Sequence, residues 1–184
     1  EHSGTHLNAP ISFHPYGLDI SAFPSERLVA PAAVIDLREQ AAADRDHALT
    51  PDDILAWERQ HGSIAEGSLV LLFTGWQAKW ERPEEFLGQD ASGGMHFPGF
   101  GVDAVRFLLE ERMVAGIGID THGVDPGQDD SFSVNRLVLA QPRIVLENLT
   151  NLDQLPPLGA TLVIGILRLR GGSGSPVSVL AFVP

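Results

Sequence analysis

The chain has 184 residues, of which 43% are hydrophobic and 20% charged, a composition typical of a single globular domain with a substantial core. A formal net charge of −12 argues against partners that present phosphates, so neither nucleic acid nor an anionic membrane surface is expected to bind. The absence of cysteine excludes disulfides, thiolate zinc sites and cysteine nucleophiles, and no apolar run approaches the roughly 20 residues of a membrane-spanning helix.

The first fourteen residues place three of the seven histidines near an asparagine, a Gly-Thr step and a proline. His2, His6 and Asn8 supply imidazole nitrogens and a hard oxygen, the donor types that suit one divalent ion. Gly4 and Pro10 disfavour a helix, and residues four apart in a straight strand lie roughly 13 Å from each other. A metal site therefore predicts a bent strand or loop at Gly4. The alternative is a polar, half-exposed segment with ordinary histidines.

Two further elements are predicted in the first third of the chain. Residues 27–37 have the apolar, β-branched character of a strand, in which Pro31 requires an edge or a bulge. Thr50, followed by a proline and two aspartates, is a strong helix start, because the hydroxyl caps the helix and the acids face its positive end. We expect this helix over residues 51–61, ended by Gly62 in the left-handed αL conformation.

The rest of the chain continues the alternation of strands and helices. Residues 67–74 form an apolar run typical of a buried strand, whose end delivers Gly75 and Trp76 to a cleft. Residues 102–112 have the pattern of an amphipathic helix. Further strands are expected over residues 116–120, 143–146 and 160–170, the last changing from a continuous apolar run to an alternating one, and a turn over 171–175 precedes a final strand through Phe182. This order predicts an α/β domain.

Several segments resemble, in the same order, the signature segments of the cyclase family of metal-dependent hydrolases, which includes bacterial kynurenine formamidases and isatin hydrolase. The stretch His-Ser-Gly-Thr-His-Leu-Asn-Ala-Pro at residues 2–10 is similar to the family pattern His-x-Gly-Thr-His-x-Asp-x-Pro-x-His. The further matching segments are residues 74–76, 96–100, 118–121, 124–126, 144–149 and 151–156. The similarity thus spans almost the whole chain.

The resemblance implies a fold and a set of metal ligands. The fold is a swivelling β/β/α-type single domain over residues 1–184, with a mixed sheet and flanking helices, lacking the strands that usually open the family's domain. His2 and His6 would ligate zinc or manganese, and Glu147 would bring a carboxylate with a metal-binding and catalytic role from the far end of the sequence. The resemblance also implies a homo-oligomer. A cytoplasmic location is expected, with a removed N-terminal leader as the alternative.

Three positions depart from the family pattern. Asn8 stands where the family has its ligand aspartate, Ser12 where it has the proposed general base, a histidine, and Asn135 where it has a further metal-site histidine. A neutral amide holds a divalent cation less tightly than a carboxylate does, so the affinity for metal is expected to fall. Serine cannot accept a proton near neutral pH, so activation of water would rest on the metal, on Glu147 or on a relocated imidazole.

Two histidines are candidates for that imidazole. His14 lies two residues beyond Ser12 with the same side-chain parity, and we predict it as the proton carrier. His122 follows Asp120 and Thr121 at the end of a predicted strand. The alternative for both is an ordinary surface or hydrogen-bonded histidine.

Aromatic side chains close to the predicted site would decide the class of substrate. A flat aryl amide, such as a formylated aniline, would stack well on aromatic walls in loops rich in glycine and proline. Trp80 and Phe100 are either such walls or packing residues. The predicted substrate-binding residues are Ser12, Trp76, Phe97 and His122.

Two functional hypotheses follow. The first is a metal-dependent hydrolase of a small N-acyl or cyclic amide, with arylformamidase activity as its most specific form and with His2, His6, Asn8 and Glu147 around the ion. The second is a catalytically inactive small-molecule or protein-binding module that keeps the fold, which Ser12 and Asn135 favour. The sequence has no Gly-x-Ser-x-Gly elbow, so it does not support a serine hydrolase.

Overall fold

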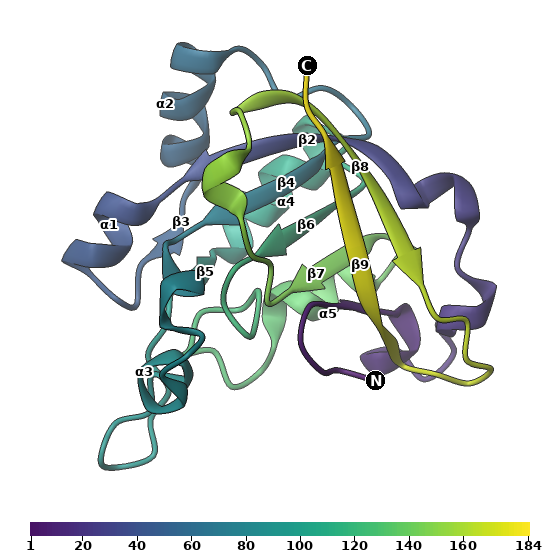
Figure 1. Ribbon diagram of the computed structural model, residues 1–184, viewed down its shortest axis with the longest axis horizontal. Helices are drawn as coiled ribbons and strands as arrows, with labels where there is room; N and C mark the ends of the chain where they lie inside the picture. Colours follow the sequence, from purple (N-terminus) through teal and green to yellow (C-terminus); the bar gives the residue numbers. More distant parts are fainter.

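A closed barrel of seven strands forms the centre of the computed structural model, which describes residues 1–184 (Figure 1). The strand order is β1-β7-β6-β4-β2-β8-β9. Strands β2, β4, β6 and β7 run parallel, whereas β1, β8 and β9 close the barrel through antiparallel pairs. The bounds are β1 His6–Asn8, β2 Val29–Asp36, β4 Leu69–Phe73, β6 Gly116–Ile119, β7 Ile144–Glu147, β8 Leu158–Ile166 and β9 Gly174–Phe182. The expected α/β class with a mixed sheet is confirmed.

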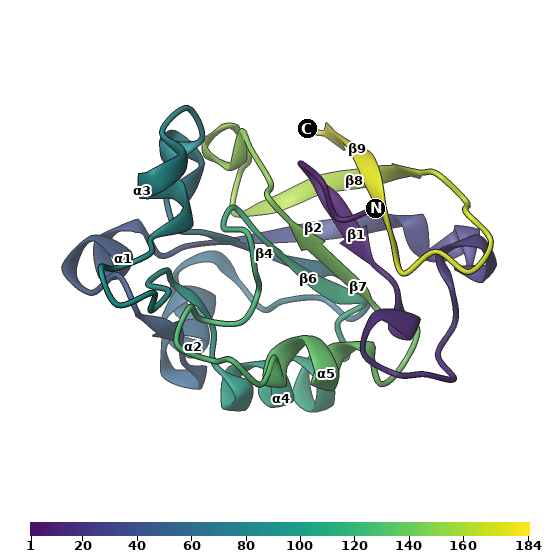
Figure 2. The same cartoon turned by 90° about the horizontal axis from the view of Figure 1, so that it is seen from below.

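Five α-helices and a small second sheet complete the fold. The helices are α1 Arg38–Ala43, α2 Pro51–His61, α3 Pro83–Leu87, α4 Val102–Glu111 and α5 Ser133–Leu139, and the small parallel sheet pairs β3 Ala48–Leu49 with β5 Gly99–Phe100. Helices α2, α4 and α5 cover one face of the parallel strands (Figure 2). No helix combines the length and the apolar character that crossing a bilayer requires.

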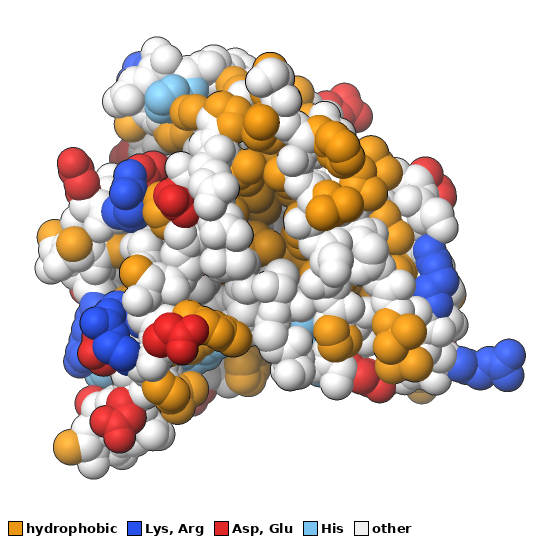
Figure 3. Space-filling model, in the orientation of Figure 1, with side chains coloured by type: hydrophobic (Ala, Val, Ile, Leu, Met, Phe, Trp, Pro, Cys, Tyr) orange, Lys and Arg blue, Asp and Glu red, His pale blue; other side chains and the backbone are white.

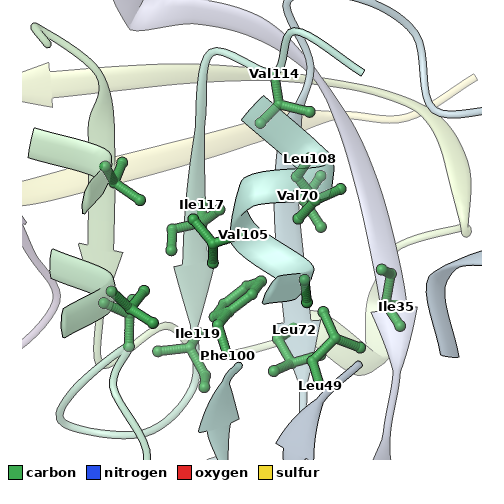
Figure 4. Close-up of a cluster of buried hydrophobic side chains, with 14 of the residues drawn as sticks. Ile35, Leu49, Val70, Leu72, Phe100, Val105, Leu108, Val114, Ile117 and Ile119 are labelled. Atoms are coloured by element: carbon green, nitrogen blue, oxygen red, sulfur yellow. The ribbon is translucent and has the colours of Figure 1, made fainter. Parts of the chain in front are cut away.

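The parallel strands β4, β6 and β7 are buried on both faces along their whole length, which explains their continuous apolar runs. In β4, Leu69 and Leu71 belong to the hydrophobic cluster inside the barrel, whereas Val70 and Leu72 belong to the cluster beneath the helices. Figure 4 shows this second cluster, in which the strand side chain Val70 lies beside Leu108 of α4. The strands therefore form a rigid support for the segments that leave their ends.

Two local predictions agree with the structure. Thr50 and Asp53 form a reciprocal capping box at the start of α2, in which each side chain accepts a hydrogen bond from the backbone N–H of the other residue. Pro31 lies in β2 where the register with β8 shifts, so the predicted bulge is present and the missing N–H is tolerated.

Two other predictions were wrong in detail. Gly62 ends α2 with φ 100° and ψ 165°, an extended conformation at positive φ rather than αL. Strand β8 ends at Ile166, not at residue 170, because Arg168 turns away and donates hydrogen bonds to the carbonyl oxygens of Ser21 and Phe23. Burial already alternates along β8 from Gly159 onward, since one face of this strand points into the barrel and the other points outward.

Candidate metal-binding and catalytic site

A cavity of about 930 Å³ opens where the N-terminal strand joins the barrel. Strand β1 pairs with β7 in antiparallel register, and this pairing places His6 directly opposite Glu147. Asn8 lies on the same face of β1 as His6, because side chains two residues apart in a strand point the same way. The pairing therefore brings three predicted ligands from opposite ends of the sequence to one wall of the cavity.

The bend before β1 orients His6. Gly4 has φ 61°, a left-handed conformation that glycine adopts without strain, and its carbonyl oxygen lies 2.9 Å from Nδ1 of His6. Since a carbonyl can only accept, Nδ1 carries the proton, and Nε2 of His6 faces Oε2 of Glu147 at 3.0 Å. Two electron-rich atoms at that distance need a positive charge between them. A proton on Nε2, which the raised pKa of His6 favours, would supply that charge.

Both groups of this pair are buried, and each shifts the pKa of the other. Burial by itself lowers the pKa of His6, but its hydrogen bonds to Glu147 and to the carbonyl of Gly4 outweigh that effect, and the pKa is raised. Burial by itself raises the pKa of Glu147, but the contact with His6 prevails and the pKa is lowered. The site thus favours a cation beside the ionised carboxylate.

A chain of amides extends this pair. Nδ2 of Asn135 donates to Oδ2 of Asp125 at 2.8 Å and to Oε1 of Glu147 at 3.2 Å. Oδ1 of Asn135 accepts from Nδ2 of Asn8 at 3.1 Å, and Oδ1 of Asn8 lies 2.8 Å from Nδ1 of His2. Asp125, which the sequence analysis did not single out, is buried, and this burial raises its pKa despite the hydrogen bonds from Asn135. Its place in one of the matching segments, directly before Pro126, was the signal available in the sequence.

The donor atoms on this wall are of the types that bind a divalent ion, although some of them belong to neutral side chains. The backbone hydrogen bond of His6 at Nδ1 is the arrangement that orients a metal-binding imidazole through its other nitrogen. Nε2 of His6, a carboxylate oxygen of Glu147 and Oδ1 of Asn8 are borderline and hard donors that suit zinc or manganese. No three histidine or acidic side chains surround a single point, so a neutral amide or solvent would have to complete the shell.

Aromatic and apolar side chains form the other wall of the cavity. The rings of Phe97 and His122, both predicted to contact substrate, have centroids 4.1 Å apart. His96, the neighbour of Phe97, holds the loop that carries both residues in place through two carboxylates. Its Nδ1 lies 2.7 Å from Oδ2 of Asp46, and its Nε2 lies 3.2 Å from Oδ2 of Asp90. These two carboxylates raise the pKa of His96, with Asp46 making the larger contribution. The cavity is also lined by Phe13, Met95 and Phe132, which the sequence analysis missed.

The predicted site residues divide into those that line the cavity and those that do not. His2, His6, Asn8, Ser12, Phe97, His122, Asn135 and Glu147 line it. Trp76 does not, because its indole is buried against Phe86 and donates a hydrogen bond to the carbonyl oxygen of that residue. Phe100 is fully buried in the core, and Trp80 lies exposed by a separate, smaller pocket.

His14 is the second predicted site residue that points elsewhere. It follows the short 3-10 helix Pro10–Ser12, which reverses the chain, so the parity expected of a strand does not apply. Its Nε2 lies 2.9 Å from the carbonyl oxygen of Arg136, and its ring lines a different surface pocket. The predicted role as proton carrier therefore has no geometric support.

This position of His14 leads to a simple expectation. The variant His14→Ala should retain kcat within about threefold of the parent, because the imidazole does not reach the cavity. Steady-state hydrolysis assays measure this, with the Tm of the variant as a check on folding. A loss of more than about 100-fold in kcat at an unchanged Tm would restore His14 as the proton carrier.

Comparisons with known proteins agree with this architecture. The family model described as "Putative cyclase" matches residues 1–126. An isatin hydrolase of Roseibium aggregatum is 39% identical over 193 residues, covering 100% of this chain and 72% of that protein. A kynurenine formamidase of Paracidovorax citrulli is 28% identical, covering 100% of this chain and 76% of that protein.

Solved structures show the same fold. Isatin hydrolase A of Ralstonia solanacearum superposes with a TM-score of 0.94 at 39% identity, covering 100% of this chain and 73% of that one. A predicted metal-dependent hydrolase of Bacillus stearothermophilus superposes with a TM-score of 0.66 at 28% identity, covering 98% and 76%. The match of the family model over most of the chain, and the 39% identity to an isatin hydrolase along the whole of this chain, show that this protein belongs to the cyclase family.

Proposed function

We propose that the protein is a metal-dependent hydrolase of a small N-acyl or cyclic amide. The observation that carries this proposal is the buried pair of His6 and Glu147, 3.0 Å apart on the wall of a cavity large enough for a small aromatic substrate. The relatives support it, since the names isatin hydrolase and kynurenine formamidase describe hydrolysis of a cyclic amide and of a formamide. The similarity to a metal-dependent hydrolase supports the need for an ion.

In this proposal His6 and Glu147 hold the ion, and Asn8 and His2 contribute from the adjacent part of the same wall. A bound divalent ion polarises a carbonyl and lowers the pKa of water. The rings of Phe97 and His122, which are tilted by 56° to each other, provide an aromatic corner against which an aryl group packs. The ion that we propose is zinc or manganese, which the mixed nitrogen and oxygen donors both suit.

His122 takes the proton-carrying role that His14 cannot fill. Its Nε2 donates a hydrogen bond to the carbonyl oxygen of Leu87 at 3.2 Å, so in the neutral ring Nδ1 is free to accept a proton. Burial lowers the pKa of His122, which keeps the ring neutral at physiological pH. Since His122 lines the cavity, a substrate bound against Phe97 would lie beside it.

The test combines metal analysis with an activity screen. The purified protein, offered zinc and manganese separately, should retain about one equivalent of metal per chain and hydrolyse some N-formylanilines or cyclic amides. His6→Ala should lose the metal and reduce kcat/KM by at least about 100-fold, because a first ligand of the ion is removed. His61→Ala, which removes a histidine outside the cavity, is the matched control and should change neither quantity.

A second candidate function rests on a different observation. The side chain of Asn8 donates a hydrogen bond to that of Asn135, and Ser12 donates one to the carbonyl oxygen of Ala9. These three side chains are uncharged and already have hydrogen-bond partners, so they do not require a metal ion to balance a negative charge. A catalytically inactive binding module would bind the same compounds, raise its Tm with them and leave them intact. Absence of metal from the purified protein, together with intact compounds, would favour this module over the hydrolase.

We also propose that the protein acts as a homo-oligomer. Hydrophobic side chains gather on the face of the molecule where β8 and β9 lie (Figure 3). Leu180, Phe182 and Val183 are more than half exposed there, at 59%, 61% and 54%, and a second subunit would cover them. Light scattering coupled to size-exclusion chromatography measures the oligomeric state. A location in the cytoplasm remains a prediction.

A further inference from the structure

The amide group of Asn135 has a fixed orientation. Its side chain is buried, and its nitrogen lies between the carboxylates of Asp125 and Glu147, at 2.8 Å and 3.2 Å. Carboxylate oxygens only accept, so the NH2 group must face them. Asp125 itself is held by the backbone N–H groups of Val134 at 2.6 Å and of Asn135 at 3.3 Å. The amide of Asn135 therefore cannot turn over without placing an oxygen against two acidic groups.

The fixed amide of Asn135 also determines the orientation of the amide of Asn8. Oδ1 of Asn135 faces Asn8 at 3.1 Å and attracts the NH2 group of that side chain. The carbonyl oxygen of Asn8 is therefore turned the other way, toward Nδ1 of His2 at 2.8 Å. An oxygen is the end of an amide that binds cations, whereas an NH2 group repels them.

We propose that Asn135 is a positioning residue. It makes Asn8 present its carbonyl oxygen, rather than its NH2 group, to the cavity wall that carries His2, His6 and Glu147. The orientation of the Asn8 amide thus depends on the orientation of the Asn135 amide. The importance of this orientation for metal binding rests on the proposed function. The orientation itself does not.

One consequence is that aspartate, although the stronger metal ligand, is unfavourable at position 8 when it is introduced alone. Asn8→Asp keeps the shape of the side chain and replaces the NH2 group by an oxygen. That oxygen would face Oδ1 of Asn135 at the present separation of 3.1 Å, and Asn135 has no alternative orientation. By contrast, Asn8→Ala removes the side chain and leaves Oδ1 of Asn135 able to accept from water in the open cavity.

The decisive measurement is the order of melting temperatures in chelator-treated, metal-free protein. We expect Asn8→Asp to lower the Tm by about 4 to 10 °C, and Asn8→Ala to lower it by less, although alanine is the larger structural change. The substitution Asn8→Asp should lower the Tm by less than half as much in an Asn135→Ser background, where the fixed amide oxygen is replaced by a shorter hydroxyl that can donate. If Asn8→Asp is as stable as the parent, or more stable than Asn8→Ala, the proposal is wrong.

Metal titration then separates this inference from the proposed function. In calorimetric titrations with zinc and with manganese, Asn135→Ser should weaken binding by about 10-fold or more, as expected when a residue that orients a ligand is removed. Should the parent protein bind neither metal, the hydrolase proposal fails, while the order of melting temperatures still tests the amide pair. Metal binding that Asn135→Ser leaves unchanged would contradict the positioning role alone. If the Asn135→Ser variant does not fold, the order of the two Asn8 variants decides.

Discussion

Replacing Glu147 by glutamine is expected to abolish metal binding and hydrolysis while leaving the metal-free fold intact. The carboxylate accepts from Asn135 through Oε1 and faces Nε2 of His6 through Oε2, at 3.0 Å. Glutamine has the same shape and can keep its oxygen toward Asn135 while its NH2 group donates to the unprotonated Nε2 of His6. The variant thus satisfies both buried partners without a positive charge, and it occupies the electron pair that the ion would need.

The expected magnitudes distinguish a ligand from a merely structural residue. The Tm of metal-free Glu147→Gln should lie within about 3 °C of the parent, since no buried group is left unpaired. Its affinity for zinc or manganese, measured by calorimetric titration, should fall by at least about 100-fold, and kcat/KM should fall with it. Glu84→Gln, an exposed change in α3, controls for the lost charge. Normal metal content in Glu147→Gln would remove Glu147 from the ligand set.

Local chemistry along the chain was sufficient to predict most of the fold. The capping residues Thr50 and Asp53 predicted the start of α2, and the apolar run of β4 predicted a buried strand. These signals are local because each depends on a helix terminus or on the burial of consecutive side chains. Short elements such as α3 and β3 were missed, because they have too few residues for a periodic pattern.

The site was predictable only in part, because its geometry depends on contacts between distant segments. The donor types of His2, His6 and Asn8 suggested a metal site, with ordinary histidines as the alternative, and the resemblance added Glu147, whose position opposite His6 results from the pairing of β1 with β7. The roles predicted for His14 and Trp76 failed because both side chains found partners outside the cavity, which no local pattern reveals. The dependence of Asn8 on Asn135 likewise exists only in three dimensions.

The barrel itself controls the site through strand β7, which carries Glu147 at its end. This strand packs against β6 so closely that Gly116 has no space for a side chain. A Cβ atom at Gly116 would lie 2.1 Å from the carbonyl oxygen of Ile144 and 2.7 Å from its backbone nitrogen. Because these are backbone atoms in paired strands, the clash cannot be relieved by a side-chain rotation. Strand β7 would have to move, and Glu147 would move with it.

Gly116→Ala is therefore expected to lower the free energy of unfolding by about 3 kcal/mol or more, and the Tm by about 10 °C. Gly165→Ala, in the exposed part of β8, is the matched control. A Cβ atom there meets only the carbonyl oxygen of Ser178, at an ordinary 3.6 Å, and the Tm should change by less than about 2 °C. Thermal unfolding followed by circular dichroism compares the two. Equal stability of the variants would mean that β6 and β7 can separate without cost, and that the position of Glu147 does not depend on their close contact.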